Sequence, residues 1–143
     1  MNSSLELLYL IVFTGILAVG YSYLLSGQIL SSSAGNEKMR EIAGAIQIGA
    51  KAYLNRQYKT IAIVGLIVLI IVTYFFNILV GVGYFIGAAL SGAAGYIGML
   101  ISVQANVRTA EASRKSLQSG LSIAFKSGAI TGLLVAGLAL LSI

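Results

Sequence analysis

The side chains that could act as acids, bases or metal ligands are few in this 143-residue sequence. It contains no His, Cys or Asp, so the usual general base and the thiolate ligands are absent. Its carboxylates are Glu6, Glu37, Glu41 and Glu111. Four scattered carboxylates are too few to form both a Mg²⁺ cluster and a general base. We therefore predict that this chain contains no catalytic, cofactor-binding or metal-binding residues and is not an enzyme on its own.

The 17 glycines do not form a phosphate-binding loop. Lys126, Ser127 and Gly128 have the residue types of such a loop, but they lie within an apolar segment. A Walker loop or a dinucleotide fingerprint instead connects a strand to a helix. The sequence therefore gives no indication of a nucleotide-binding site.

The composition indicates the environment in which these side chains must be held. Apolar residues make up 58% of the sequence and charged residues 9%, against about 25% charged residues in a soluble domain. In lipid, a spanning segment satisfies its backbone polar groups as a helix of about 20 apolar residues. The apolar segments are residues 5–25, 61–76, 84–103 and 120–143. We predict an all-α integral membrane protein, a single unit over residues 1–143 with four transmembrane helices in two hairpins.

The second predicted helix begins well before its apolar segment. Asn36 is suited to be its N-cap, and apolar residues then recur at spacings of three and four. A helix over residues 36–76 would be about 60 Å long, twice the ~30 Å thickness of the hydrocarbon core. Its first half is therefore expected to extend into the cytoplasm, unless a break near residues 58–61 divides it. The expected links are residues 26–35, 77–83 and 104–119.

Positively charged residues lie on one side of this arrangement. All nine are in, or beside, the first and third links: Lys38, Arg40, Lys51, Arg56, Lys59, Arg108, Arg114, Lys115 and Lys126. The N-terminal tail, the second link and the C-terminal end have none. By the positive-inside rule, both basic links are predicted to be cytoplasmic and both termini to face outward. Their charge is explained by this topology, so we expect no nucleic acid as a partner.

Small residues recur every fourth position on the last two predicted helices. One ridge is Gly83, Gly87, Ser91 and Gly95, and the other is Ser116, Gly120, Ala124, Gly128, Gly132 and Ala136. In lipid, such ridges allow two helix backbones to approach closely. We interpret them as packing faces, and the alternative is a substrate path lined by glycine.

Tyrosines and cations gather where the long helix would enter the membrane, at residues 52–60. Aromatic and basic residues are typical of interfacial anchors, which is the interpretation we favour. A functional alternative is that Arg56 or Lys59 attracts an anionic substrate. Residues 106–109, with Asn106 and Arg108, are interpreted in the same way, as a polar exit from the third span.

Three stretches resemble one known family. Residues 39–61, including Arg56-Gln57-Tyr58-Lys59-Thr60, resemble the start of the second transmembrane helix of membrane-bound inorganic pyrophosphatases. Residues 95–110, including Asn106-Val107-Arg108-Thr109, are similar to the third helix and the cytoplasmic link of that family, and residues 120–136 to its fourth helix. The resemblance covers residues 35–139, while the first span is generic.

The resemblance implies pyrophosphate hydrolysis coupled to the translocation of H⁺ or Na⁺. It also implies a homodimer, a requirement for Mg²⁺, and an external N-terminus. In this family the hydrolytic centre consists of Asp-rich motifs on later helices, and the first four helices belong to an outer ring. This sequence has none of those motifs, so no catalytic residue carries over and Mg²⁺ is not expected on this chain. Arg56, Lys59, Asn106 and Arg108 would support the helices without touching substrate.

The leading hypothesis is therefore that the chain forms the N-terminal outer-ring helices of such a pump and is inactive alone. The last apolar segment reaches Ile143 without a polar flank, so we expect the natural chain to continue and to supply the remaining helices as partners. We expect it in the lipid bilayer of a bacterial inner membrane. The resemblance does not distinguish H⁺ from Na⁺, and H⁺ is preferred as the commoner case.

Two other functions remain open from the sequence. A small four-helix transporter would need an ionisable residue at mid-membrane, and Glu6 and Lys126 are the nearest candidates. Neither is well placed, since Glu6 lies at the edge of its span. A structural membrane subunit would instead use the glycine ridges to pack against a larger complex.

Overall fold

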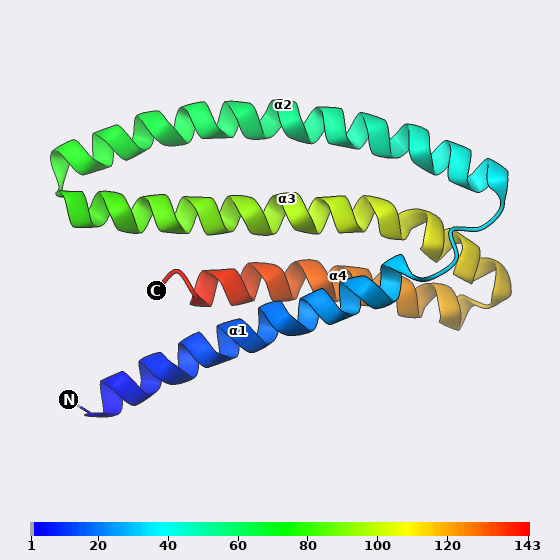
Figure 1. Ribbon diagram of the computed structural model, residues 1–143, viewed down its shortest axis with the longest axis horizontal. Helices are drawn as coiled ribbons and strands as arrows, with labels where there is room; N and C mark the ends of the chain where they lie inside the picture. The colour runs from blue at the N-terminus through cyan, green and yellow to red at the C-terminus, as the bar shows by residue number, and fades with distance from the viewer. Residues whose placement is uncertain (1) are drawn as a thin grey trace.

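Four long helices make up almost the whole molecule. The computed structural model describes residues 2–143. It contains α1 (Asn2–Leu30), α2 (Glu37–Phe75), α3 (Ile78–Lys115) and α4 (Leu117–Leu140), with short connections between them (Figure 1). Each helix includes a stretch long and apolar enough to cross a membrane. The prediction of an all-α membrane protein with four spanning helices is confirmed.

Polar side chains determine where three of these helices begin. The Oδ1 atom of Asn36 accepts a hydrogen bond from the Met39 amide at 2.9 Å, which confirms the predicted N-cap of α2. Asn77 caps α3 in the same way, and the Ser116 hydroxyl accepts from the Ser119 amide at 3.1 Å to cap α4. Each cap satisfies one of the backbone donors that a helix start leaves unpaired.

The links are much shorter than the sequence pattern predicted. α1 continues to Leu30, α3 begins directly after Asn77, and α3 continues to Lys115, so the predicted links 77–83 and 104–119 are almost entirely helical. The reason is that polarity alone does not end a helix. The hydroxyl of Ser113, for example, donates to the carbonyl of Thr109 in its own helix at 2.8 Å. Serine and threonine can therefore continue a helix that crosses the membrane boundary.

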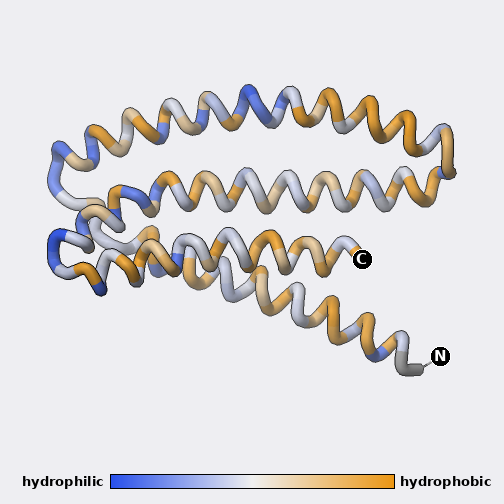
Figure 2. Tube along the Cα trace, turned by 180° about the vertical axis from the view of Figure 1, so that it is seen from behind, coloured by the Kyte–Doolittle hydropathy of each residue, from blue (hydrophilic) through white to orange (hydrophobic). Residues whose placement is uncertain are grey.

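α2 is continuous, as the favoured prediction required, and the alternative break near residues 58–61 does not occur. Its 39 residues correspond to about 58 Å. The sequence did not reveal that α3, with 38 residues, is equally long. The two helices form a hairpin whose polar half extends past the apolar stretches, and Figure 2 shows hydrophilic residues on that half of α2 and at the same end of α3.

The helices pack in the order α2, α3, α4, α1. α3 lies between α2 and α4, and α1 packs mainly on α4, with a few contacts to α3. Along the described residues the consecutive helices α1 and α2 do not contact each other. The α1–α2 and α3–α4 connections lie together at one end of the molecule, named the basic end from here on, while both chain termini point toward the other end (Figure 1).

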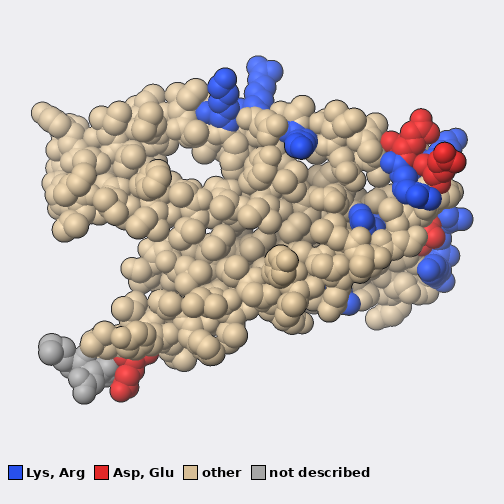
Figure 3. Space-filling view, viewed as in Figure 1, with Lys and Arg blue, Asp and Glu red and all other residues tan. Residues whose placement is uncertain are grey.

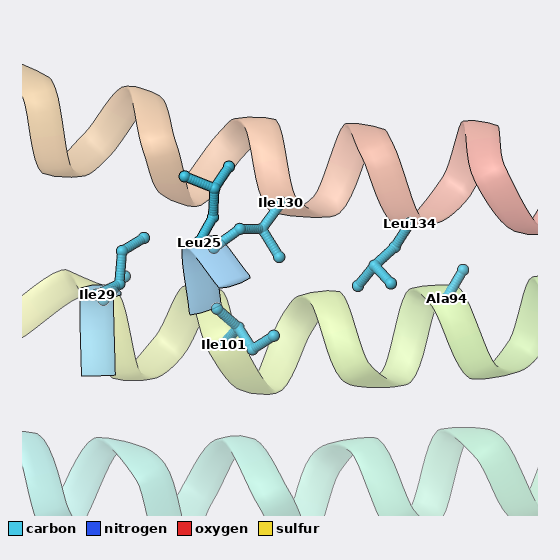
Figure 4. Close-up of a cluster of buried hydrophobic side chains, with 7 residues drawn as sticks. Leu25, Ile29, Ala94, Ile101, Ile130 and Leu134 are labelled. Carbon is cyan, nitrogen blue, oxygen red and sulfur yellow. The ribbon is translucent and has the colours of Figure 1, made fainter. Parts of the chain in front are cut away.

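A small apolar core lies where α1, α3 and α4 meet (Figure 4). Its buried members are Leu25, Ile29, Ala94, Ile101, Ala105, Ile130 and Leu134. α2 contributes none of them, and the buried side chains of α2 are Ala43 and Leu54. Most large apolar side chains of residues 61–76 are exposed on the surface of the protein. This half of α2 is therefore available to lipid or to other helices.

Close helix packing does use small residues, but largely not those of the predicted ridges. A Cβ atom added at Gly83, Gly87, Gly128 or Gly132 would meet nothing within 4 Å. The backbones of α1 and α4 instead touch at Gly15, where a Cβ would lie 2.9 Å from the carbonyl oxygen of Gly137. Further buried small residues lie along α3, namely Gly81, Ala94, Gly98, Ala105 and Ala112. Because α3 and α4 have small residues on several faces, spacing alone did not identify the packed one.

Candidate functional site at the basic end

Arg108 connects two helices at the basic end. Its Nε donates to the carbonyl of Ser32 at 3.1 Å, and its Nη2 donates to the carbonyl of Leu30 at 2.9 Å. Its Nη1 donates to the carbonyl of Gln104 in its own helix at 2.7 Å. The guanidinium of α3 thus binds carbonyl groups at the C-terminal end of α1.

This contact has a clear electrostatic origin. The last carbonyls of a helix lack partners within the helix and form the negative end of its dipole. A planar guanidinium can donate to several of them at once, which a lysine ammonium does with less geometric specificity. Arg108 is half-buried and its contacts are to backbone oxygens, so its position is that of a structural clamp.

The α1–α2 connection is held by a second group of contacts. Gly35 has a φ of 79°, and its amide donates to the Ser33 hydroxyl at 3.2 Å. On α3, Arg114 forms an ion pair with Glu111 at 3.0 Å, and its guanidinium lies 3.9 Å from the Met39 sulfur. α2 therefore begins against the charged end of α3.

Tyrosines connect α2 and α3 farther along the hairpin. The hydroxyl of Tyr96 donates to Oδ1 of Asn55 at 3.0 Å. The rings of Tyr58 and Tyr96 pack edge to face, with centroids 5.1 Å apart. Part of the 52–60 stretch is thus a packing contact, which suits tyrosines that carry a polar hydroxyl on an apolar ring.

The other residues singled out from the sequence are not brought together. The side chains of Arg56, Lys59 and Asn106 are exposed and form no hydrogen bond within residues 2–143. Glu6 is exposed on the first turns of α1, and Lys126 is half-buried on α4. Among the described residues, no three His, Cys, Asp or Glu side chains are grouped to hold a metal ion. Figure 3 shows Lys and Arg side chains gathered at the basic end and along α2, and an acidic patch near the N-terminal end of α1.

Two cavities next to the helices were not anticipated. An apolar slot of about 600 Å³ lies between α2 and α3, lined on α3 by residues such as Ala88, Ala89 and Gly92. A polar cavity of about 570 Å³ lies at the basic end. Its walls come from the α1–α2 connection, α3 and α4, for example Ser33, Arg108 and Ser122. Residues so distant in sequence give no local pattern that reveals the cavity.

Comparison with known sequences identifies the family of this chain. The family described as inorganic H⁺ pyrophosphatase matches residues 16–143. The chain belongs to this family. A K⁺-insensitive pyrophosphate-energized proton pump of Methanosarcina mazei is 44% identical over 138 residues, which cover 95% of this chain and 21% of that protein. A putative K⁺-stimulated pyrophosphate-energized sodium pump of Bacteroides thetaiotaomicron is 41% identical over 143 residues, 96% of this chain and 20% of that protein.

Another K⁺-insensitive pyrophosphate-energized proton pump, from Caldanaerobacter subterraneus, is 40% identical over an alignment that covers 100% of this chain and 22% of that protein. The chain thus spans about a fifth of the length of these pyrophosphatase relatives. Family membership confirms the resemblance drawn from residues 39–61, 95–110 and 120–136. It also confirms that this is an integral membrane protein, because the relatives are membrane pumps and the four helices are long and apolar enough to span.

Proposed function

We propose that this chain forms the N-terminal outer-ring helices of a pyrophosphate-energised ion pump and is inactive alone. The observation that carries the proposal is the family match over residues 16–143 combined with coverage of about a fifth of the related pumps. In the complete pump, pyrophosphate hydrolysis would drive the translocation of H⁺ or Na⁺. The relatives include both proton and sodium pumps, and we retain H⁺ as the proposed ion.

The role of these helices in the pump would be structural. The donor set does not suit Mg²⁺, because Glu111 is paired with Arg114 and residues 2–143 contain no group of three possible metal ligands. The Mg²⁺ and the pyrophosphate would be bound by residues outside this chain. Arg108 would support the outer ring by holding α1 against α3, and Arg56, Lys59 and Asn106 would remain at the surface.

Orientation and assembly form part of the same proposal. The nine basic residues lie at the basic end, along α2 as far as Lys59, or at Lys126 of α4, and none lies near the termini or the Asn77 turn; the basic end would therefore be cytoplasmic and both termini external. The membrane would be a bacterial inner membrane, and the complete pump would be a homodimer. The exposed small residues of α4, which are Ala124, Gly128, Gly132 and Ala136, would receive the remaining helices of the pump.

The transporter alternative receives no support from the arrangement of ionisable groups. Glu6 and Lys126 lie on different helices and are not paired with each other. The alternative of a structural subunit is favoured by one observation, the open small-residue ridge of α4. In both the subunit and the pump, this ridge would pack against other helices. The two differ only in the activity of the complete assembly.

A chimera tests the proposal. The matching 138 residues of the Methanosarcina mazei proton pump would be replaced by this chain and expressed in membrane vesicles. We expect Mg²⁺-dependent pyrophosphate hydrolysis and pyrophosphate-driven proton uptake from the chimera, and neither from this chain alone or from the relative without the segment. Gly128→Leu should weaken association with the other helices because the open ridge is filled, whereas Gly20→Leu, at an exposed glycine of α1, serves as the matched control.

Two results would contradict the proposal. One is a chimera that inserts and assembles at the level of the parent pump but hydrolyses no pyrophosphate. The other is hydrolysis or cation uptake by this chain alone, with uptake abolished by Glu6→Gln, which would favour the transporter.

A further inference from the structure

Most residues that line the polar cavity at the basic end carry polar or charged groups, although the exposed wall that they form is more apolar than polar in area. It is lined by Ser32, Ser33, Arg108, Glu111, Ala112, Lys115, Gln118, Ser119, Ser122 and Ile123. Its volume of about 570 Å³ leaves room for a ligand much larger than a water molecule. The cavity lies where α4 begins, at the boundary between the charged end of the molecule and its apolar spans.

The charges around the cavity favour an anion. Arg108 and Lys115 line it directly, and the one acidic lining residue, Glu111, is neutralised by its ion pair with Arg114. A guanidinium has five N–H donors, and the hydrogen bonds of Arg108 to Leu30, Ser32 and Gln104 occupy three of them. The positive end of the α4 dipole, which begins at Leu117, adds to this field.

Several polar groups in the wall are available to a ligand. Within residues 2–143, the side chains of Lys115, Gln118 and Ser122 form no hydrogen bond. They follow one another over the last residue of α3 and the first two turns of α4. These exposed side chains line one open space with an ammonium, an amide and a hydroxyl, which are donors suited to the oxygen atoms of a phosphate group.

An apolar stripe on α4 continues from this polar space. Leu117, Leu121 and Phe125 are spaced four residues apart and are 84%, 59% and 75% exposed. They are rotated by about 100° around the helix from the stripe that contains Gln118 and Ser122, since each is one position earlier in the sequence. Ala112 and Ile123 add apolar surface to the cavity itself. A free phosphate ion would make no use of these surfaces, whereas the acyl chains of a lipid would cover them.

We propose that the cavity binds the phosphate headgroup of an anionic phospholipid, whose acyl chains lie along the Leu117–Phe125 stripe of α4. Lys115 and the two remaining donors of Arg108 contact the phosphate, while Gln118 and Ser122 bind its oxygens or those of the glycerol. Basic pockets between transmembrane helices on the cytoplasmic side are known to hold such headgroups. The inference does not depend on the pump function.

Lipid retention by this chain tests the inference. The purified chain would be equilibrated at 0.15 M salt in mixed micelles with equal phosphatidylglycerol and phosphatidylcholine, and the lipids that remain bound would be counted by native mass spectrometry. We expect preferential retention of phosphatidylglycerol. Lys115→Gln should lower its occupancy about fivefold, whereas Lys59→Gln, an exposed lysine away from the cavity, should not. Helical content and melting temperature would be measured for every variant.

A second pair of variants changes the shape of the cavity without changing charge. Ser122→Leu should fill the cavity and reduce phosphatidylglycerol retention to the level of phosphatidylcholine, while Ser91→Leu, at an exposed serine of α3, should leave it unchanged. Arg108 is not varied because it also clamps α1. Ser122→Leu keeps the test decisive if Lys115→Gln folds poorly.

Three outcomes would overturn the inference. Equal retention of the two lipids by the unmodified chain would exclude a site selective for the anionic headgroup. Equal losses in Lys115→Gln and Lys59→Gln would show diffuse attraction to the positive surface in place of a site. Full displacement of phosphatidylglycerol by millimolar inorganic phosphate, with no dependence on Ser122, would identify a site for free anions.

Discussion

Replacing Arg108 with alanine should loosen the C-terminal end of α1 while leaving the membrane spans in place. The side chain donates two hydrogen bonds to carbonyls of the α1 terminus, Leu30 and Ser32. A hydrogen bond from a charged group contributes about 1.5–3 kcal/mol, so the two together contribute at least about 3 kcal/mol. Because the guanidinium is half-buried, water can replace some of the lost hydrogen bonding, and we expect the last turn of α1 to lose about 2 kcal/mol of stability.

Hydrogen–deuterium exchange measures this change directly. The amides of Ser31 and Ser32 donate to carbonyls of the last α1 turn at 3.1 and 3.0 Å, so they are protected as long as that turn is closed. A loss of about 2 kcal/mol raises the opening equilibrium about 30-fold, and exchange in a peptide over residues 27–35 should accelerate by that factor. Arg108→Lys keeps the positive charge without the planar guanidinium, so its exchange rate in this peptide should lie between those of the unmodified chain and Arg108→Ala.

Arg56→Ala is the matched control, since that side chain is exposed and has no hydrogen-bond partner within residues 2–143. It should leave exchange of the 27–35 peptide unchanged. The reasoning fails if Arg108→Ala does not accelerate exchange there. It also fails if all four helices accelerate equally, because the effect would then be global unfolding and not release of a local clamp.

Two glycines yield further predictions. Gly15→Leu should destabilise the chain by about 3 kcal/mol because its Cβ would lie 2.9 Å from the Gly137 carbonyl oxygen. Gly20→Leu, where a Cβ has open space, should change stability by less than about 0.5 kcal/mol. SDS titration followed by circular dichroism would compare the two variants, and equal midpoints would contradict the α1–α4 contact. Gly35→Ala should cost about 1–2 kcal/mol in the same titration, since its φ of 79° strains an L-residue and its Cβ would lie 2.6 Å from the Met39 sulfur; an unchanged midpoint would argue against this turn.

The spanning helices and the length of α2 could be predicted from the sequence because few alternatives exist. An apolar stretch such as residues 61–76 can satisfy its backbone in lipid only as a helix. Asn36 was identified as an N-cap because its side chain precedes a helical pattern, and the structure confirms it. These are local properties, and each depends on residues that are neighbours in sequence.

Helix ends and helix neighbours could not be predicted with the same success. The polar residues after Gln104 were taken to end α3, but their hydroxyl and guanidinium groups bond to carbonyls of the same helix and it continues to Lys115. The pairing of α1 with α4 depends on a contact between Gly15 and Gly137, which are 122 positions apart in the sequence. Small residues occur on several faces of these helices, so the pattern did not select the contact.

The candidate site, too, was predicted only in part from the sequence. A supporting role for Arg108 was implied by the family resemblance, and its contacts with the α1 terminus agree with that role. The clamp itself has no signal in the sequence, because its acceptors are backbone carbonyls. The polar cavity was also missed, since it joins residues of the α1–α2 connection, such as Ser33, to residues of α4, such as Ser122.

The lateral order of these helices follows from what lipid can and cannot do. Burying an apolar side chain between helices gains little over leaving it in lipid, so large side chains cannot decide which helices are neighbours. Close backbone contacts and polar contacts remain, and in this chain they include the Gly15–Gly137 crossing, the approach of Gly98 to Thr131, the Tyr96–Asn55 hydrogen bond and the Arg108 clamp. None of these contacts involves residues 61–76, which agrees with the sparse packing of that apolar half of α2. Changes at the basic end should therefore alter how the helices are arranged without altering whether they insert.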